Sequence, residues 1–200
     1  MGADPALRAR LIAGLERDRI TRRRLVDEGK LFVGYAPEME RVHLENAAAL
    51  DAVLAEHGWP GTALAGADGC AAAWAIAMHA IGLPALQRRA LALLEEAVAR
   101  GDAPPELAAR LVDRIRFNEG RPQRYGTIFD WDERGALSPG PIEAAEDVDR
   151  RRAAVGLPPL AEEIARRRAA PREPGDAPPR DHAARRRELE AWRRKAGWIE

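Results

Sequence analysis

Apolar residues recur along the first part of the chain with the period of an α-helix. Between residues 4 and 28 they fall on one side at a spacing of about 3.6 residues, while arginines cover the other side. Asp4 can cap the start of this segment, with Pro5 in the first helical position. Gly29 follows its last apolar residue. The pattern therefore predicts an amphipathic N-terminal helix.

Four further helices follow, and glycine and proline separate them. They are predicted over residues 37–57, 68–81, 84–100 and 105–118. The segment 68–81 is almost entirely apolar and rich in alanine, which allows neighbouring helices to approach closely. We therefore expect this helix to lie at the centre of the core.

The period changes after residue 118. Residues 125–137 read as two short extended segments around a turn, which predicts a small β-hairpin. Two short helices then follow, over 147–155 and up to residue 168, before a proline-rich stretch and a basic, helix-prone end. The predicted class is all-α, a mainly helical single domain with a small β-hairpin near residues 125–137. Its predicted parts are an N-terminal basic helix and link (1–36), a helical core domain (37–169), a linker (170–180) and a basic C-terminal helical tail (181–200).

Composition narrows the choice of partners. Among 200 residues, 46% are hydrophobic but only 5% are aromatic, which favours packed helices over a β-sandwich. The 32 basic and 32 acidic residues cancel, so we expect no nucleic-acid partner. Without an apolar run of membrane length or a signal core, we expect no membrane partner and a cytoplasmic location. The basic terminal helices are either solvated faces or surfaces for a protein partner or self-association.

The chain shows no pattern of a metal or cofactor site. Cys70 is the only cysteine and lies in an apolar segment, which is more typical of a core residue than of a nucleophile. No glycine-rich phosphate loop is present. The histidines lack the spacing of metal ligands; they are His43, His57, His79 and His182. We therefore predict no metal and no cofactor.

Polar residues that can carry chemistry concentrate between Asp113 and Thr127. Asp113 and Arg114 point about 100° apart on a helix, and Arg114 shares the apolar stripe, so we predict that Arg114 points inward. A buried arginine needs an anion, which is either a ligand group or a carboxylate of the protein. The carboxylates within the acidic stretch are those of Asp130, Glu143 and Asp149.

Other candidates each have a catalytic and a structural interpretation. His79, on an apolar helix, is either a general acid or base or a core histidine. Tyr125 and Thr127 share one face of an extended segment, with Gly126 leaving room for close approach between them. Arg151 and Arg152 either clamp an anion or pair with the acidic residues 143–149. Trp59 is either a core residue under a turn or the wall of a pocket.

The motifs also occur in a characteristic order. They are Gly58-Trp59-Pro60, His79-Ala80, Asp113-Arg114, Gln123-x-Tyr125-Gly126-Thr127 and Arg151-Arg152-x3-Gly156-Leu157. This series resembles a bacterial family known only as a domain of unknown function, over about residues 38–166. The resemblance implies a mainly helical single domain and no established activity, cofactor or substrate. That family usually has Gln before the histidine, Asp two residues after it, and Gln after Tyr-Gly-Thr; here these are Met78, Ile81 and Ile128.

Two functional hypotheses follow. In the first, the chain is a bacterial small-molecule enzyme or ligand-binding domain that recognises an anionic group. Its catalytic residues are His79 and Tyr125, His79 and Arg114 share one pocket, and the ligand-binding residues are Arg114, Gln123, Thr127, Arg151 and Trp59. In the second, it is a non-catalytic helical interaction module, and the same residues form a structural network. A solvent-reached cavity favours the first hypothesis, and a closed, mutually satisfied network favours the second.

Overall fold

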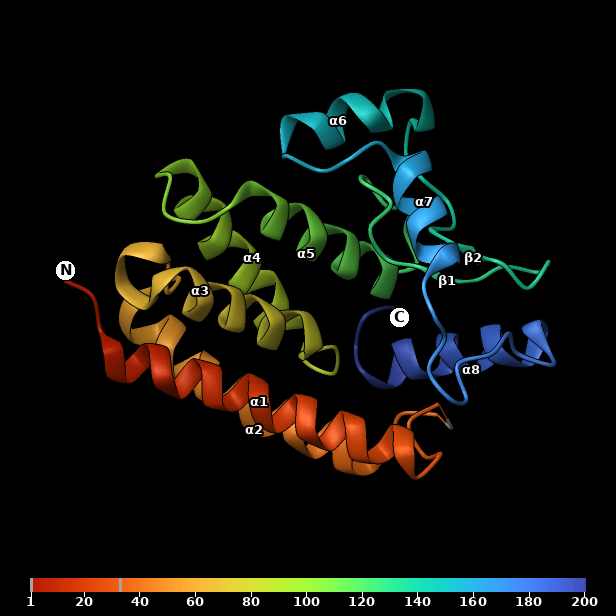
Figure 1. Ribbon diagram of the computed structural model, residues 1–200, viewed down its shortest axis with the longest axis horizontal. Helices are drawn as coiled ribbons and strands as arrows, with labels where there is room; N and C mark the ends of the chain where they lie inside the picture. The colour runs from red at the N-terminus through yellow and green to blue at the C-terminus, as the bar shows by residue number, and fades with distance from the viewer. Residues whose placement is uncertain (1, 33) are drawn as a thin grey trace. The chain divides into compact units, whose positions relative to one another are not determined.

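The computed structural model describes residues 2–32 and 34–200, and it is mainly helical (Figure 1). The helices and strands are α1 (Pro5–Asp27), α2 (Pro37–His57), α3 (Thr62–His79), α4 (Pro84–Ala99), α5 (Pro105–Asn118), β1 (Asp130–Trp131), β2 (Leu137–Ser138), a short 3₁₀ turn η1 (Ala145–Asp147), α6 (Val148–Ala154), α7 (Leu160–Ala169) and α8 (His182–Lys195). The predicted mainly helical class with one small hairpin is confirmed. Within the described residues, no helix is both long enough and apolar enough to cross a bilayer.

The chain divides into two compact units, and the boundary between them in the sequence falls within α5. The first unit runs to Ala108 and includes the short segment Glu173–Asp176, and the second unit holds 109–172 and 177–200. The boundaries predicted from composition, at residues 36, 169 and 180, concern independent folding and stay predictions.

In the first unit, α1 packs against α2 and α3. The helix begins where the sequence predicts, because the Asp4 carboxylate accepts a hydrogen bond from the Leu7 amide at 2.9 Å. Gly14 lies on the buried face, where a Cβ atom would come within 3.1 Å of the Asn46 side-chain oxygen. The absence of a side chain at Gly14 therefore lets α1 approach α2 closely.

The start of α3 differs from the prediction. The sequence predicts a start at residue 68, but the helix begins at Thr62 and is kinked at Gly66, whose φ is 72°. Asp102 holds the additional first turn, because its backbone oxygen accepts from the Thr62 amide (2.8 Å) and its carboxylate from the Ala63 amide (2.7 Å). This cap comes from a residue about forty positions away, so local sequence patterns do not reveal it.

Half of the alanines of α3 are buried, as expected for a helix that packs in the core; they are Ala65, Ala72, Ala73 and Ala77. Trp59 is also buried, and its indole N–H donates to the Cys70 sulfur at 3.4 Å. Burial raises the pKa of the Cys70 thiol, while the contact with Trp59 opposes this effect. Trp59 and Cys70 therefore lie together in the core of the first unit.

The C-terminal end of α3 is held by a buried glutamine of α4. Gln87 is fully buried, and its side-chain amide donates to the backbone oxygens of Ala77 (2.7 Å) and Met78 (3.2 Å). These oxygens lie in the last turn of α3, where the Ala77 oxygen also accepts from the Ala80 amide at 3.3 Å. Gln87 thereby fixes the residues that immediately precede His79.

In the second unit, β1 and β2 pair antiparallel, with Asp130 opposite Ser138 and Trp131 opposite Leu137. The Asp132 carboxylate closes the turn by accepting from the amides of Arg134 and Ala136, each at 2.9 Å. The pairing begins five residues later than predicted. Residues 123–128 make other hydrogen bonds, described below.

The C-terminal helix α8 contacts the hairpin region of the second unit. Arg185 pairs with Asp130 at 2.7 Å, and Arg186 pairs with Glu133 at 2.5 Å. Arg193 donates to the backbone oxygen of Phe117 and lies over its ring. A groove of about 420 Å³ lies among the hairpin, the loop at residues 120–123 and two arginines of α8.

Replacing Gln87 by leucine should destabilise the first unit. Leucine has a similar volume but cannot donate, so the oxygens of Ala77 and Met78 lose their bonds to Gln87, at a cost of about 1–3 kcal/mol. Chemical denaturation measures the difference in unfolding free energy. Glu95→Gln, on the exposed face of the same helix, serves as the control and should change stability by less than about 0.5 kcal/mol. Equal stabilities of Gln87→Leu and the control would contradict the role given to Gln87.

Candidate functional site

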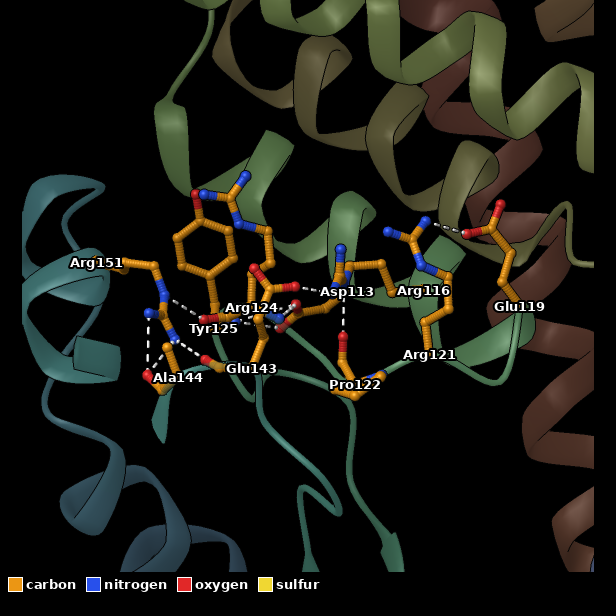
Figure 2. A network of polar contacts seen from close by, with 10 residues as sticks. All are labelled: Asp113, Arg116, Glu119, Arg121, Pro122, Arg124, Tyr125, Glu143, Ala144 and Arg151. Carbon is orange, nitrogen blue, oxygen red and sulfur yellow. Dashed lines mark hydrogen bonds and ion pairs between the residues drawn. The ribbon is translucent and has the colours of Figure 1, made fainter. Parts of the chain in front are cut away.

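Several residues between Asp113 and Thr127 form a polar network in the second unit (Figure 2). At its centre, the fully buried Asp113 carboxylate accepts hydrogen bonds from the amides of Arg124 (2.7 Å), Tyr125 (3.1 Å) and Thr127 (2.9 Å). The Thr127 hydroxyl adds a further bond of 2.9 Å. Asp113 is therefore the wholly buried residue of the Asp113-Arg114 pair, although the Arg114 Nε atom is also buried, as the sequence predicts.

Gln123 joins the loop to the hairpin. Its side-chain amide donates to the backbone oxygens of Ile128 (2.8 Å) and Pro139, and its side-chain oxygen accepts from the Ile128 amide at 2.8 Å. Its own backbone bonds to Pro141 and Glu143. All polar atoms of this buried side chain thus bond to the protein backbone.

Arg151 and Arg152 bind backbone carbonyls rather than carboxylates. Arg151 donates to the carbonyl oxygens of Arg124 (2.8 Å), Glu143 (2.5 Å) and Ala144 (3.1 Å), as Figure 2 shows. The buried Arg152 donates to those of Tyr125 and Pro158. The two arginines therefore tie α6 to the loop that Asp113 holds.

Gly126 is needed at its position for two reasons. Its φ is +66°, in the left-handed region that residues with a Cβ rarely adopt. A Cβ atom there would also lie 2.9 Å from Ile142 Cδ1 and 3.0 Å from Leu160 Cδ1. The turn at Gly126 lets the amides on either side of it point at the same carboxylate.

Arg114 and Tyr125 are two predicted residues of this region that are only partly buried. Arg114 is partly buried, and its Nε atom is buried without a partner among the described residues. Burial lowers the pKa of Arg114 to about 10, against the opposing charge of Asp130. Tyr125 is also partly buried, with the Arg124 guanidinium 5.9 Å from its ring centre.

The first unit holds a second polar cluster, built from three helices. Asp18 lies on α1, His43 on α2, and His79 is the last residue of α3. Oδ2 of Asp18 lies 2.7 Å from His79 Nδ1 and 3.0 Å from His43 Nε2. The two imidazole rings are tilted against each other, with their centres 5.0 Å apart. One buried carboxylate oxygen thus serves two histidines.

The hydrogen bonds indicate where the ring protons lie. A carboxylate can only accept, so a neutral His79 carries its proton on Nδ1 and has Nε2 as its acceptor. A neutral His43 carries its proton on Nε2, and its Nδ1 accepts from the Tyr35 hydroxyl at 2.6 Å. Burial raises the pKa of Tyr35, and the charges of Glu40 and Asp18 add to this effect, so the phenol stays protonated.

The charge of Asp18 is stabilised by its neighbours. Burial alone would raise the pKa of Asp18, but the hydrogen bonds and charges of His43 and His79 outweigh it and hold the pKa well below its ordinary value. The cluster is closed around Asp18, whose side chain is 4% exposed, and open at His79, whose side chain is 40% exposed. It therefore combines a fixed buried charge with a ring that solvent can reach.

The same three side chains can also hold a metal ion. One ligand atom from each lies within 4.8 Å of the others, and two imidazoles with one carboxylate are a ligand set that zinc and other divalent transition metals accept. The sequence predicts no metal here, because the ligands come from three separate helices and show no local spacing.

One signal in the sequence does point to this cluster. Asp18 falls on the apolar stripe of α1, in the series Leu7, Leu11, Gly14, Asp18 and Leu25. An acid within an apolar stripe has to meet a partner in the interior. Reading Asp18 as part of the solvated arginine-rich face conceals this signal.

The structure brings the predicted residues together in two separate groups. His79 and Trp59 belong to the first unit, whereas Arg114, Gln123, Tyr125, Thr127 and Arg151 belong to the second. In the second unit, Gln123, Thr127 and Arg151 all bond to the Asp113 network or its loop. A pocket shared by His79 and Arg114 stays a prediction.

Comparison with known proteins gives a family but no activity. A family model described as a family of unknown function, DUF6624, matches residues 5–170. The chain belongs to this family. The match includes α1, which the sequence resemblance leaves outside its range, and it therefore includes all three residues of the Asp18–His43–His79 cluster. No curated protein and no solved structure matches the chain.

Replacing Gly126 by alanine should destabilise the second unit more than the same change at Gly140. Both glycines have positive φ, but only Gly126 has side-chain atoms within reach of a Cβ, whereas Gly140 has none within 4 Å. The backbone cost is therefore common to both variants, and the crowding adds roughly 1–3 kcal/mol at Gly126. Denaturant unfolding of the two variants measures this difference, and equal losses would show that the crowding has no effect.

Asp18 should make the protein lose stability at acid pH. A carboxyl whose pKa is lowered by folding stabilises the folded state above its unfolded pKa of about 3.9, and the contribution is lost as pH falls through the folded pKa. Unfolding free energy measured from pH 6 downward should therefore fall less steeply in Asp18→Asn than in the natural protein. Asp27→Asn, at an exposed position of the same helix, should keep the natural slope. Parallel curves for all three proteins would rule out this contribution.

Proposed function

We propose that the protein is a small-molecule enzyme and that His79 and Asp18 are its reactive pair. The observation that carries the proposal is a hydrogen bond between an exposed imidazole and a buried carboxylate. His79, with 40% of its side chain exposed, bonds at 2.7 Å to Asp18, whose side chain is 4% exposed. This is the arrangement by which a carboxylate orients an imidazole for general acid–base catalysis.

Each group has a distinct role in such a reaction. The Asp18 carboxylate holds the Nδ1 proton, so Nε2 of His79 accepts a proton from a bound molecule. The imidazolium that results is stabilised by the adjacent negative charge and by its location at the C-terminus of α3. The same ring then returns the proton to the product. General acid–base catalysis of this kind contributes roughly 10²–10⁴-fold to a rate.

The surrounding residues keep the pair in position. Gln87 fixes the last turn of α3, and His43 with Tyr35 holds the second side of the Asp18 oxygen. These contacts limit the movement of the carboxylate and of the helix end. A catalytic pair needs supporting hydrogen bonds of this kind to keep its geometry.

A divalent metal ion is the second candidate for the same centre. The observation that favours it is the approach of the three ligand atoms to within 4.8 Å of one another. Zinc would bind two imidazole nitrogens and the carboxylate, and it would leave a position open for water or a ligand. Binding requires that the nitrogens facing Asp18 give up their protons, so the metal and the proton-transfer pair exclude each other.

The second unit supports a different role for most of the predicted residues. Because the Asp113 network is mutually satisfied, we assign Gln123, Thr127, Arg151 and Asp113 to the architecture of the hairpin loop. Arg114, with its unpartnered Nε, and Tyr125 remain the candidates in this unit for binding an anionic group. If the first unit lacks activity as well, the whole protein is best described as a helical interaction module. We expect the protein to be bacterial and cytoplasmic.

Mass spectrometry of a small-molecule extract tests this proposal. The full-length protein is incubated with the extract, and compounds that are consumed or formed are identified. His79→Asn should reduce turnover of any such compound by about 10²-fold or more while leaving the melting transition cooperative. His57→Asn is the matched control, because His57 lies in the same unit but contacts Glu56 rather than Asp18.

The same assay separates the alternatives. Turnover that survives a chelator supports proton transfer by His79, whereas turnover that a chelator removes and Zn²⁺ restores supports the metal. Full turnover by His79→Asn would refute both forms of the proposal. If the natural protein changes no compound in the extract but another protein co-purifies with it, the interaction module is favoured.

A further inference from the structure

Arg22 lies one helical turn beyond Asp18 on α1. Residues four apart on a helix share one face, so the guanidinium of Arg22 and the carboxylate of Asp18 lie on the same side of α1. The hydrogen bond to Glu173 raises the pKa of Arg22, and the charge of Asp18 adds to this effect. A cation thus lies beside the candidate reactive centre and within the same unit.

The guanidinium of Arg22 is already occupied by a carboxylate from a distant part of the chain. Nη1 of Arg22 donates to Oε1 of Glu173 at 2.6 Å, and Nη2 donates to Oε2. Two parallel bonds of this kind are the way in which arginine recognises a carboxylate or a phosphoryl group of a ligand. Glu173 therefore occupies Arg22 as such a ligand would.

Glu173 belongs to a segment that is set apart from its sequence neighbours. The residues Glu173–Asp176 join the first unit, whereas those on either side belong to the second. The segment forms a tight turn, in which the Asp176 amide donates to the Glu173 carbonyl at 3.0 Å. Gly175 lies against Phe32, with a Cβ position 3.3 Å from the ring. We call residues 173–176 the acidic turn.

The pair is suited to displacement. The side chains of Arg22 and Glu173 are 41% and 44% exposed, and ion pairs at this exposure contribute little to stability. The acidic turn also comes from a stretch with few apolar side chains, so little burial offsets the entropy lost when it is ordered. At neutral pH its carboxylate stays charged, because the hydrogen bonds and charge of Arg22 lower the pKa of Glu173. A ligand anion therefore competes with a weak internal anion.

We propose that Arg22 is the anion-binding residue of the site at Asp18 and His79, and that Glu173 is its built-in competitor. The ligand class is a small molecule with a carboxylate or phosphoryl group, held by Arg22 so that its remainder reaches the exposed ring of His79. This inference rests on the proposed function for the location of chemistry, but anion binding does not depend on turnover. The acidic turn would then have to leave Arg22 before such a ligand binds.

Binding of simple anions to the full-length protein tests the proposal. Inorganic phosphate and acetate are titrated separately at constant ionic strength, and the arginine Nε–Hε signals are followed by NMR. Glu173→Ala should bind at least one of the two anions about fivefold more tightly than the natural protein, the shift expected when an exposed ion pair of ordinary strength is removed. Arg22→Gln should abolish this binding.

The matched control is a second ion pair of the same helix. Arg8 pairs with Asp68 through two bonds, and their side chains are 50% and 52% exposed, so Asp68→Ala removes a comparable carboxylate from a comparable arginine. This variant should bind the anions as the natural protein does. Tighter binding of phosphate than of acetate to the protein indicates a ligand with a phosphoryl group, and tighter binding of acetate indicates a ligand with a carboxylate.

Two results would overturn the proposal. One is equal affinity in Glu173→Ala and the natural protein, and the other is anion binding that persists in Arg22→Gln. The same titration on His79→Asn separates this proposal from the proposed function. If anion binding and its dependence on Glu173 persist in that variant while no compound is turned over by the natural protein, the anion site stands and the catalytic role of His79 fails.

Discussion

A buried carboxylate has to be met by donors, and each compact unit of this protein is built around one. Moving such a charge out of water costs several kcal/mol unless hydrogen bonds or opposite charges replace the solvent. Asp113 in the second unit and Asp18 in the first are both buried, and elements distant in sequence converge on each. Meeting these two charges fixes the loop that leads to the hairpin and the meeting point of three helices.

The two aspartates are satisfied by different kinds of donor, and this difference separates architecture from chemistry. Asp113 is met by backbone amides and a hydroxyl, which do not titrate near neutral pH. Asp18 is met by two imidazoles, whose ring nitrogens can both donate and accept protons. A carboxylate surrounded by amides fixes a loop, whereas one surrounded by imidazoles can take part in proton transfer or exchange its protons for a metal. The richest motif in the sequence is therefore structural, and the sparser one is the better candidate for function.

Local patterns predict the helices of this chain well, because caps and stripes act over a few residues. The bounds of α2 and α5 agree with the prediction, and the cap at Asp4 is present. The first turn of α3 is missed because its cap, Asp102, is far away in sequence. The same limit applies to the site. His79 can be identified by its apolar surroundings, but its partners on α1 and α2 have no fixed spacing from it in the sequence. Which of the adjacent residues Asp113 and Arg114 is more buried depends on where the amides of the loop point, and the sequence does not show this.

The core of the first unit holds the only thiol of the chain, Cys70, in contact with the indole of Trp59. A thiol that is buried and whose pKa is raised reacts with alkylating reagents only when the surrounding helices separate. Its rate of modification therefore reports the opening equilibrium of the first unit, without a contribution from the second. Compared with the free energy of unfolding of the whole protein, this rate shows whether the first unit opens with the second or before it.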